Sequence, residues 1–138
     1  MPKSTTRQLS HADYETLALF RHALRRFIVF SEAAAVAEGL AAQQHQALLA
    51  IKGMACSPTV GELAERLVVR HHSAVELTGR LVRMGLVLRL PDPSDRRRVR
   101  IALTPLAEQK LAGLSAAHLE ELRVIRPLLA SLLDRFDD

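Results

Sequence analysis

The chain has 138 residues, of which 49% are apolar and only 4% aromatic, with a formal net charge of +4. This length suits one domain whose core needs no disulfide, and a single cysteine excludes an internal one. The polar N-terminus and the lack of any apolar run near the roughly 20 residues of a membrane span predict a cytoplasmic protein without signal peptide or membrane anchor.

The first third of the chain predicts two helices after a disordered arm at residues 1–9. A capping box formed by Ser10 and Asp13 is expected to begin a long helix that ends near Glu38. A second helix is expected over residues 41–52. The apolar residues of the first helix recur at steps of three and four, so we expect them to share one stripe: Leu17, Phe20, Leu24, Phe27 and Ile28.

Two short helices follow and predict a helix-turn-helix. Thr59 and Glu62 fit a capping box for a helix over residues 60–68. The turn is expected at residues 68–72, before a second helix from about Ser73 to Met84. If this second helix enters a DNA groove, its outward side and N-terminal end would meet DNA. The residues expected there are Arg70, His71, His72, Ser73, Glu76, Arg80 and Arg83.

A basic hairpin comes next, with strands at residues 86–90 and 99–103 around a turn rich in Pro and Asp. One of the tip arginines is expected to pair with Asp95 and stiffen the tip, which leaves the others for the DNA backbone. These tip residues are Arg96, Arg97 and Arg98. Helix, turn, helix and a basic hairpin together predict a mainly α winged helix-turn-helix.

The charge of the chain supports the same interpretation. The stretch from Gly61 to Arg100 contains nine arginines and five acidic residues. It therefore carries the whole net charge of +4, and the remainder of the chain is neutral. A localised basic patch is typical of nucleic-acid binding. The alternative is a solvated charged surface without a binding role.

The C-terminal third predicts a helix that starts at Thr104 and Pro105 and reaches Ile125 or Arg126. Pro127 is expected to break or kink it, because proline lacks the helical N–H. A last short helix is expected over Leu128–Phe136.

The predicted terminal helices, residues 10–38 and 104–138, carry more apolar surface than one small domain can bury. Pairing two copies would cover that surface, so we expect these helices to form a homodimer with two recognition helices for a palindromic DNA site. A monomer folded as a closed bundle is the alternative.

Other kinds of site have little support. Cys56 fits a buried, inert thiol better than a redox sensor, and the six histidines lack the spacing of metal ligands. No nucleophile elbow, phosphate loop or zinc-hydrolase motif occurs, so we expect no enzyme, no metal and no cofactor.

From about Leu40 to Leu106 the chain resembles the MarR family of bacterial transcription regulators. The motifs that carry the resemblance are Glu62-Leu63-Ala64-Glu65-Arg66-Leu67, Gly85-Leu86-Val87, Asp92-Pro93-Ser94-Asp95-Arg96-Arg97 and Leu103-Thr104. The resemblance implies a helical dimer with a small wing that regulates transcription on palindromic DNA and is often released by a small ligand. The pair His71-His72 departs from the family pattern, so no base preference carries over.

We therefore expect a homodimeric, sequence-specific regulator, a repressor, that binds double-stranded operator DNA and responds to a small-molecule effector. Phosphate contacts are expected from the wing arginines and helix ends, and base contacts from His72, Ser73, Glu76 and Arg80. The alternatives are a protein-interaction module and a non-specific architectural DNA binder with the same fold. Nothing in the sequence identifies the effector or the target genes.

Overall fold

The computed structural model describes residues 8–135, which form two compact units. We call residues 32–117 the winged-helix unit, and residues 8–31 with 118–135 the terminal helical unit. Most of the arm predicted at residues 1–9, and the predicted helix end at Phe136, lie outside the described residues. None of the helices that the structure describes combines the length and apolar character needed to cross a lipid bilayer.

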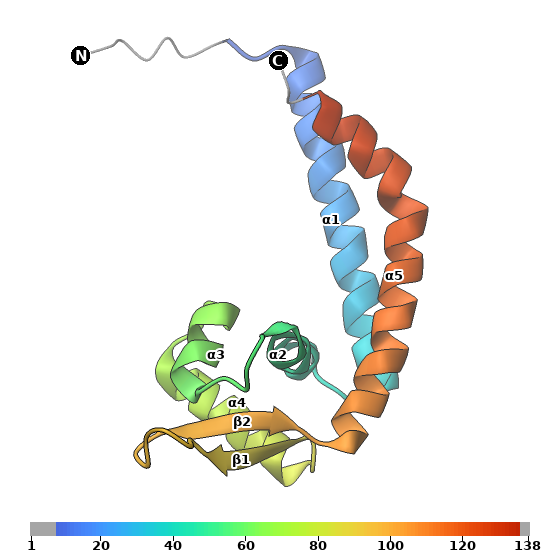
Figure 1. Ribbon diagram of the computed structural model, residues 1–138. Coiled ribbons are helices and arrows are strands. Elements are labelled where there is room, and N and C mark those ends of the chain that lie inside the picture. Colours follow the sequence, from blue (N-terminus) through green and yellow to red (C-terminus); the bar gives the residue numbers. More distant parts are fainter. Residues whose placement is uncertain (1–7, 136–138) are drawn as a thin grey trace, which may run out of the picture. The chain divides into compact units, whose positions relative to one another are not determined.

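Two long helices run through both units (Figure 1). The first, α1, spans His11–Ala37, and the last, α5, spans Pro105–Asp134. Ser10 and Asp13 form the predicted capping box: the Ser10 N–H donates to Asp13 Oδ2 at 2.8 Å, and the Asp13 N–H donates to Ser10 Oγ at 3.2 Å. The predicted start of α1 is therefore confirmed.

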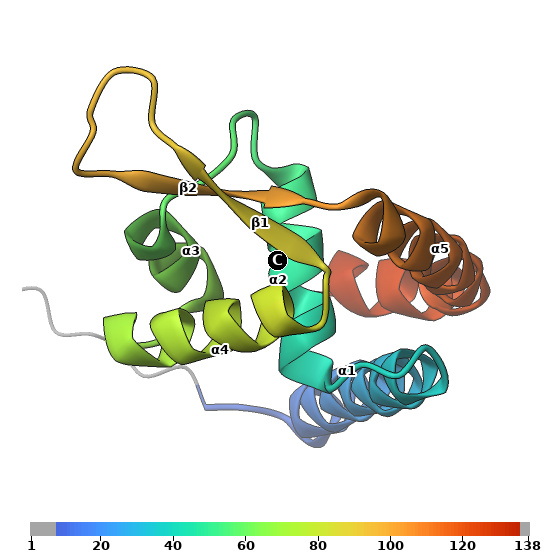
Figure 2. The ribbon, with the colours of Figure 1, turned by 90° about the horizontal axis from the view of Figure 1, so that it is seen from below.

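The predicted winged helix-turn-helix is confirmed in the winged-helix unit. Its elements in chain order are α2 (Ala42–Gly53), α3 (Val60–Leu67), α4 (His71–Arg83), β1 (Val87–Pro91) and β2 (Val99–Leu103). Helix α3 packs on α2 and α4, and the hairpin packs on the same helices (Figure 2). The side chains buried most deeply between these elements are Leu48, Leu63, Leu81, Leu86, Val87 and Ile101.

Backbone hydrogen bonds tie the hairpin to the segment before α3. The two strands are antiparallel, with Val87 opposite Leu103 and Pro91 opposite Val99. The Ile101 N–H donates to the Pro58 carbonyl at 2.8 Å, next to an isolated bridge between Thr59 and Arg100. The second strand of the wing is therefore hydrogen-bonded directly to the segment that leads into α3.

Threonine caps fix the entries of two helices. The Thr59 hydroxyl accepts from the Glu62 N–H at 3.2 Å, as predicted, although the Glu62 carboxylate bonds the Thr59 hydroxyl and not its backbone. Thr104 accepts from the Ala107 N–H at 3.2 Å and donates to the Gly85 carbonyl at 2.7 Å. Gly85 itself ends α4 at a φ of 73°, which a glycine adopts without strain.

The predicted turn of the helix-turn-helix was too long. Val68 takes the left-handed conformation, with φ 57° and ψ 46°, and its N–H donates to the carbonyls of Ala64 and Glu65. This closes α3 abruptly, so the turn is complete at Arg70. His71 and His72 therefore belong to the first turn of α4 and not to the connection.

Of the break or kink predicted at Pro127, the break and the separate last helix were wrong, because α5 continues through Pro127 to Asp134. Pro127 removes one helical hydrogen bond to the carbonyl of Arg123. Both residues are exposed, so water can satisfy that carbonyl, and the packing of the rest of the helix outweighs the lost bond.

In the terminal helical unit, α1 and α5 pack antiparallel. His118 Nε2 lies 2.7 Å from Ser31 Oγ, and Arg135 Nη1 donates to Thr16 Oγ1 at 3.0 Å. The single apolar stripe predicted for α1 divides into two. Phe20 and Phe27 are half-buried, whereas the other three members are exposed: Leu17, Leu24 and Ile28.

Candidate nucleic-acid interface

The outward side of α4 is the first part of the candidate interface. Its inner side packs into the winged-helix unit through Ala74, Thr78 and Leu81, all of them buried. At about 100° per residue, the line opposite these residues contains His72, Glu76, Gly79 and Arg83. The helix thus presents a histidine, a carboxylate, a glycine and an arginine along the centre of its outward side.

The predicted contact residues at the N-terminal end of α4 are accessible. Arg70 is the N-cap residue, with no side-chain hydrogen bond to the helix, and His71 and His72 follow it; all three are exposed. The first N–H groups of α4 are therefore not capped by Arg70, which leaves a positive helix end beside three basic or polarisable side chains.

Ser73 differs from the other predicted contact residues, because it is only half-exposed. It lines a small cavity of about 40 Å³ together with Gln43 and Gln46 of α2. Ser73 therefore lies on the side of α4 that is next to α2, away from the centre of the outward side. Its role in base recognition stays a prediction.

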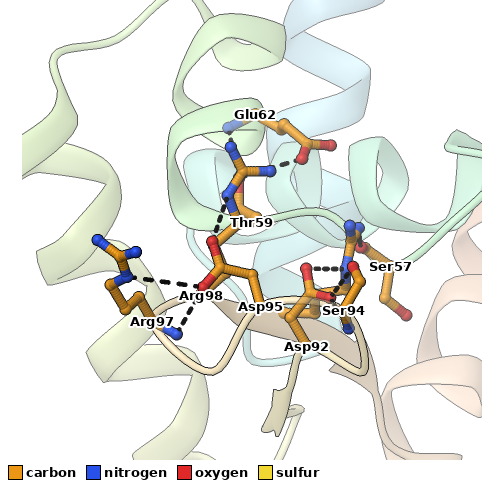
Figure 3. A network of polar contacts seen from close by, with 9 residues as sticks. Ser57, Thr59, Glu62, Asp92, Ser94, Asp95, Arg97 and Arg98 are labelled. Carbon is orange, nitrogen blue, oxygen red and sulfur yellow. Dashed lines mark hydrogen bonds and ion pairs between the residues drawn. The ribbon is translucent and has the colours of Figure 1, made fainter.

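The wing tip supplies the second part of the interface. Arg96, Arg97 and Arg98 are all exposed, and the Arg97 side chain is 96% accessible. Asp95 lies between Arg97 and Arg98 (Figure 3), with carboxylate-to-guanidinium distances of 4.0 and 3.9 Å. Its closer contact is with the Arg97 backbone N–H, at 2.9 Å. Asp95 thus organises the tip through the backbone and pairs only loosely with the side chains, leaving the guanidinium groups accessible.

A second aspartate, which sequence reasoning did not single out, holds the base of the wing. Asp92 is buried and its carboxylate accepts from the Ser94 N–H and hydroxyl, both at 2.8 Å, and from Arg100 Nε at 3.0 Å (Figure 3). Arg100 also donates to the Ser57 carbonyl at 2.7 Å. The wing is thereby clamped to the loop before α3.

The contacts of this clamp favour the ionised form of Asp92. The two Ser94 hydrogen bonds, followed by the charge of Arg100, lower the pKa of Asp92 from 3.8 to about 2, although burial opposes the shift. Arg100 is thus neutralised by Asp92 and contributes no free cation to DNA. The spacing Asp-x-Ser, typical of an aspartate-led turn, was the available signal for this site.

The remaining candidates contribute little to this surface. Cys56 is exposed and unpaired, which corrects the prediction of a buried thiol. Within residues 8–135 no three metal-binding side chains come together. His45 is buried in α2, and His118 lies between Phe27 and Phe30 in the terminal helical unit.

Comparison with known proteins agrees with this geometry. The sequence model of the MarR family matches residues 38–98. An uncharacterized HTH-type transcriptional regulator of Bacillus subtilis, YcgE, is 34% identical over 131 residues, covering 95% of this chain and 78% of that protein.

The solved structures that share the fold include two with a bound molecule. One is a MepR variant from S. aureus bound to an oligodeoxyribonucleotide, with a TM-score of 0.70 at 17% identity, over 94% of this chain and all of that one. The other is CouR from Rhodococcus jostii RHA1 bound to p-coumaroyl-CoA, with a TM-score of 0.68 at 22% identity, over 91% of this chain and 93% of that one. The chain belongs to the MarR family of DNA-binding transcriptional regulators, which are not enzymes.

Proposed function

We propose that this regulator binds a palindromic operator as a homodimer and represses transcription until a small molecule releases it. The observation that carries the proposal is the pairing of two exposed basic surfaces in one unit: the outward side of α4 and the wing tip at residues 96–98. A helix in the major groove reads base edges, and an arginine-rich tip contacts the backbone or minor groove. Acting on operator DNA, the protein would work in the cytoplasm.

Residue roles follow from this docking. His72, Glu76 and Arg80 are assigned to base edges, with Ser73 at the margin of the contact. Arg70, His71 and the wing arginines are assigned to phosphates. Asp95 is assigned to holding the tip in shape.

Two further observations support the dimer and the effector. The exposed apolar residues of α1 favour pairing of two copies, because a contiguous apolar surface of this kind is unusual on a monomer. The structural relative CouR is bound to p-coumaroyl-CoA, which supports a small-molecule effector for this fold without identifying one here. A ligand screen for release from DNA would identify it.

The test is binding to the promoter of the protein's own gene against random DNA of equal length. We expect a clear preference for the promoter, and a slope of about −0.9 in log affinity against log salt for each phosphate neutralised. Arg97→Ala should weaken binding to both DNAs by similar factors, whereas Arg80→Ala should change which sequence is preferred. A mobility-shift titration measures both effects.

Arg97→Lys is the matched control, because it keeps the charge at the wing tip. Equal affinity of the wild-type protein for promoter and random DNA would contradict sequence-specific regulation and favour a non-specific architectural role.

A further inference from the structure

A hollow lies over Gly79 on the outward side of α4, with a volume of about 460 Å³. Its lining residues are Val75, Glu76, Gly79, Arg80 and Arg83 of α4 and Arg89 of β1. A Cβ atom at Gly79 would lie 3.5 Å from Arg83 Nη1 and 3.9 Å from Arg89 Nη2. Two guanidinium groups from two different elements therefore converge on one point of the helix surface.

Within residues 8–135, none of these guanidinium groups forms an ion pair with a carboxylate. Arg80, Arg83 and Arg89 are exposed, and within residues 8–135 the ion pairs involve other cations. Glu76 lines the same hollow without forming an ion pair. Like charges held together repel each other, so this arrangement favours an anion between them.

The two nitrogen atoms lie close enough to one point for a single phosphate group to contact both. Both Arg83 Nη1 and Arg89 Nη2 lie within 4 Å of the same point above Gly79. One phosphate that accepts a charge-assisted hydrogen bond of roughly 2.8 Å from each side can bridge that gap. The missing side chain at Gly79 leaves the space that the phosphate would occupy.

The length of α4 indicates which phosphate this is, given the proposed docking of α4 in the major groove. At a rise of about 1.5 Å per residue, Arg83 lies roughly 16 Å along the axis from His72, whereas the major groove is about 12 Å wide. If the first turns of α4 reach base edges, Arg83 lies at the edge of the groove, where the backbone runs.

We propose that Arg83 and Arg89 together bind one phosphate of the DNA backbone at the edge of the major groove. This contact would set the depth and angle of α4 in the groove. Because the two arginines come from α4 and β1, it would also fix the wing relative to the helix when DNA is bound. It carries no sequence information.

The test measures DNA affinity against salt for Arg83→Ala, Arg89→Ala and the double variant, on promoter and random duplexes, by fluorescence anisotropy. Each single variant should weaken binding to both duplexes by about tenfold but leave the log–log salt slope nearly unchanged, because the remaining arginine still neutralises the phosphate. The double variant should flatten the slope by about 0.9, which is the contribution of one phosphate.

Arg26→Ala removes an equal charge from an exposed site on α1 and should leave the slope unchanged. A double variant that flattens the slope by roughly 1.8 would overturn the shared phosphate. A changed sequence preference in Arg83→Ala or Arg89→Ala, or wild-type affinity in both, would overturn the proposal as well.

A scan with single neutral methylphosphonate groups locates the contact. At one position in each half-site, the neutral group should weaken DNA binding by the wild-type protein but not by the double variant. The absence of such a position would count against the phosphate site. The salt measurements on random DNA test the shared phosphate independently of the proposed function, because they do not require a preferred sequence. A wild-type protein without sequence preference would refute specific regulation, yet it would still show whether the two arginines share a phosphate.

Discussion

At the scale of single residues, Val68 carries the clearest backbone strain in the described chain. It is a β-branched residue at φ 57°, a conformation that such side chains rarely adopt, and its side chain is 90% exposed. Packing therefore gives no reason for valine here. The left-handed position is what turns the chain sharply from α3 into α4.

Replacing Val68 by glycine should raise the free energy of unfolding by about 1 kcal/mol. The left-handed conformation costs a β-branched residue roughly 1–2 kcal/mol, and glycine avoids that cost. Part of the gain is lost because glycine has more conformational freedom in the unfolded chain. Urea unfolding measures the change. Val124→Gly is the matched control: Val124 is also exposed, but lies inside α5, so the same replacement should destabilise by roughly 0.5 kcal/mol. Destabilisation by both variants would contradict strain at Val68.

The two aspartates of the wing differ in what they hold. Asp92 is buried and bonded to Ser94 and Arg100, whereas Asp95 is half-exposed and meets its arginines only at 3.9 to 4.0 Å. The ionised form of Asp92 is favoured in the folded state, because its pKa falls from 3.8 to about 2. Stability from this group is therefore fully present above about pH 4 and is lost as the pH falls toward 2.

Asp92→Asn should lower the melting temperature at neutral pH more than Asp95→Asn, because it leaves the half-buried Arg100 without its counter-ion. Between pH 4 and 2 the wild-type protein should lose stability faster than Asp92→Asn, which no longer has a proton to bind there. Thermal unfolding followed by circular dichroism at several pH values checks both. Parallel pH profiles for the two proteins would show that Asp92 is not the group responsible.

At the scale of elements, the recognition helix α4 and the wing act as a connected pair. Helix α4 packs inward through Ala74, Thr78 and Leu81, and β1 lies against it. The wing is joined to the start of α3 through Arg100 and the Ser57 carbonyl. Because each basic surface lies on an element that is already packed in place, little further ordering of the backbone is needed when DNA binds.

At the scale of the whole molecule, the terminal helical unit exposes more apolar surface than a lone protomer should. Leu17, Leu24 and Ile28 lie on α1 with about half of each side chain accessible, and α5 exposes Leu119, Leu128 and Leu133. Residues 32–117 have a complete core of their own, so this surface is not needed to stabilise the winged-helix unit. A second copy of the chain is the partner that we propose for it.

Ile28→Asp should convert the proposed dimer to a monomer, because burying an unpaired carboxylate in an apolar interface costs several kcal/mol. Operator affinity should fall by at least about tenfold, since each monomer then meets only one half-site. Sedimentation equilibrium and anisotropy measure the two effects. Ala18→Asp adds the same charge at another exposed position of α1 and should remain dimeric. A monomeric wild-type protein would refute the dimer.

Local chemistry let the sequence predict most elements. Ser10, Thr59 and Thr104 each mark a helix start that the structure confirms, because a cap needs only residues a few positions apart. The same locality explains the errors. Pro127 is a helix breaker by its own chemistry, but α5 continues through it. No short-range pattern predicted that the turn after α3 would end at Arg70, so that His71 and His72 already belong to α4.

The sequence by itself determined the helix-turn-helix, the basic wing and the placement of the net charge, since these follow from periodicity, turn residues and composition within one stretch. Only the tertiary structure decided which charges are available. It paired Arg100 with Asp92, placed Ser73 beside α2, and brought Arg83 and Arg89 together over Gly79. Each of these depends on how separate elements pack, and an ion pair or a shared anion site exists only once distant residues lie within a few ångströms of each other.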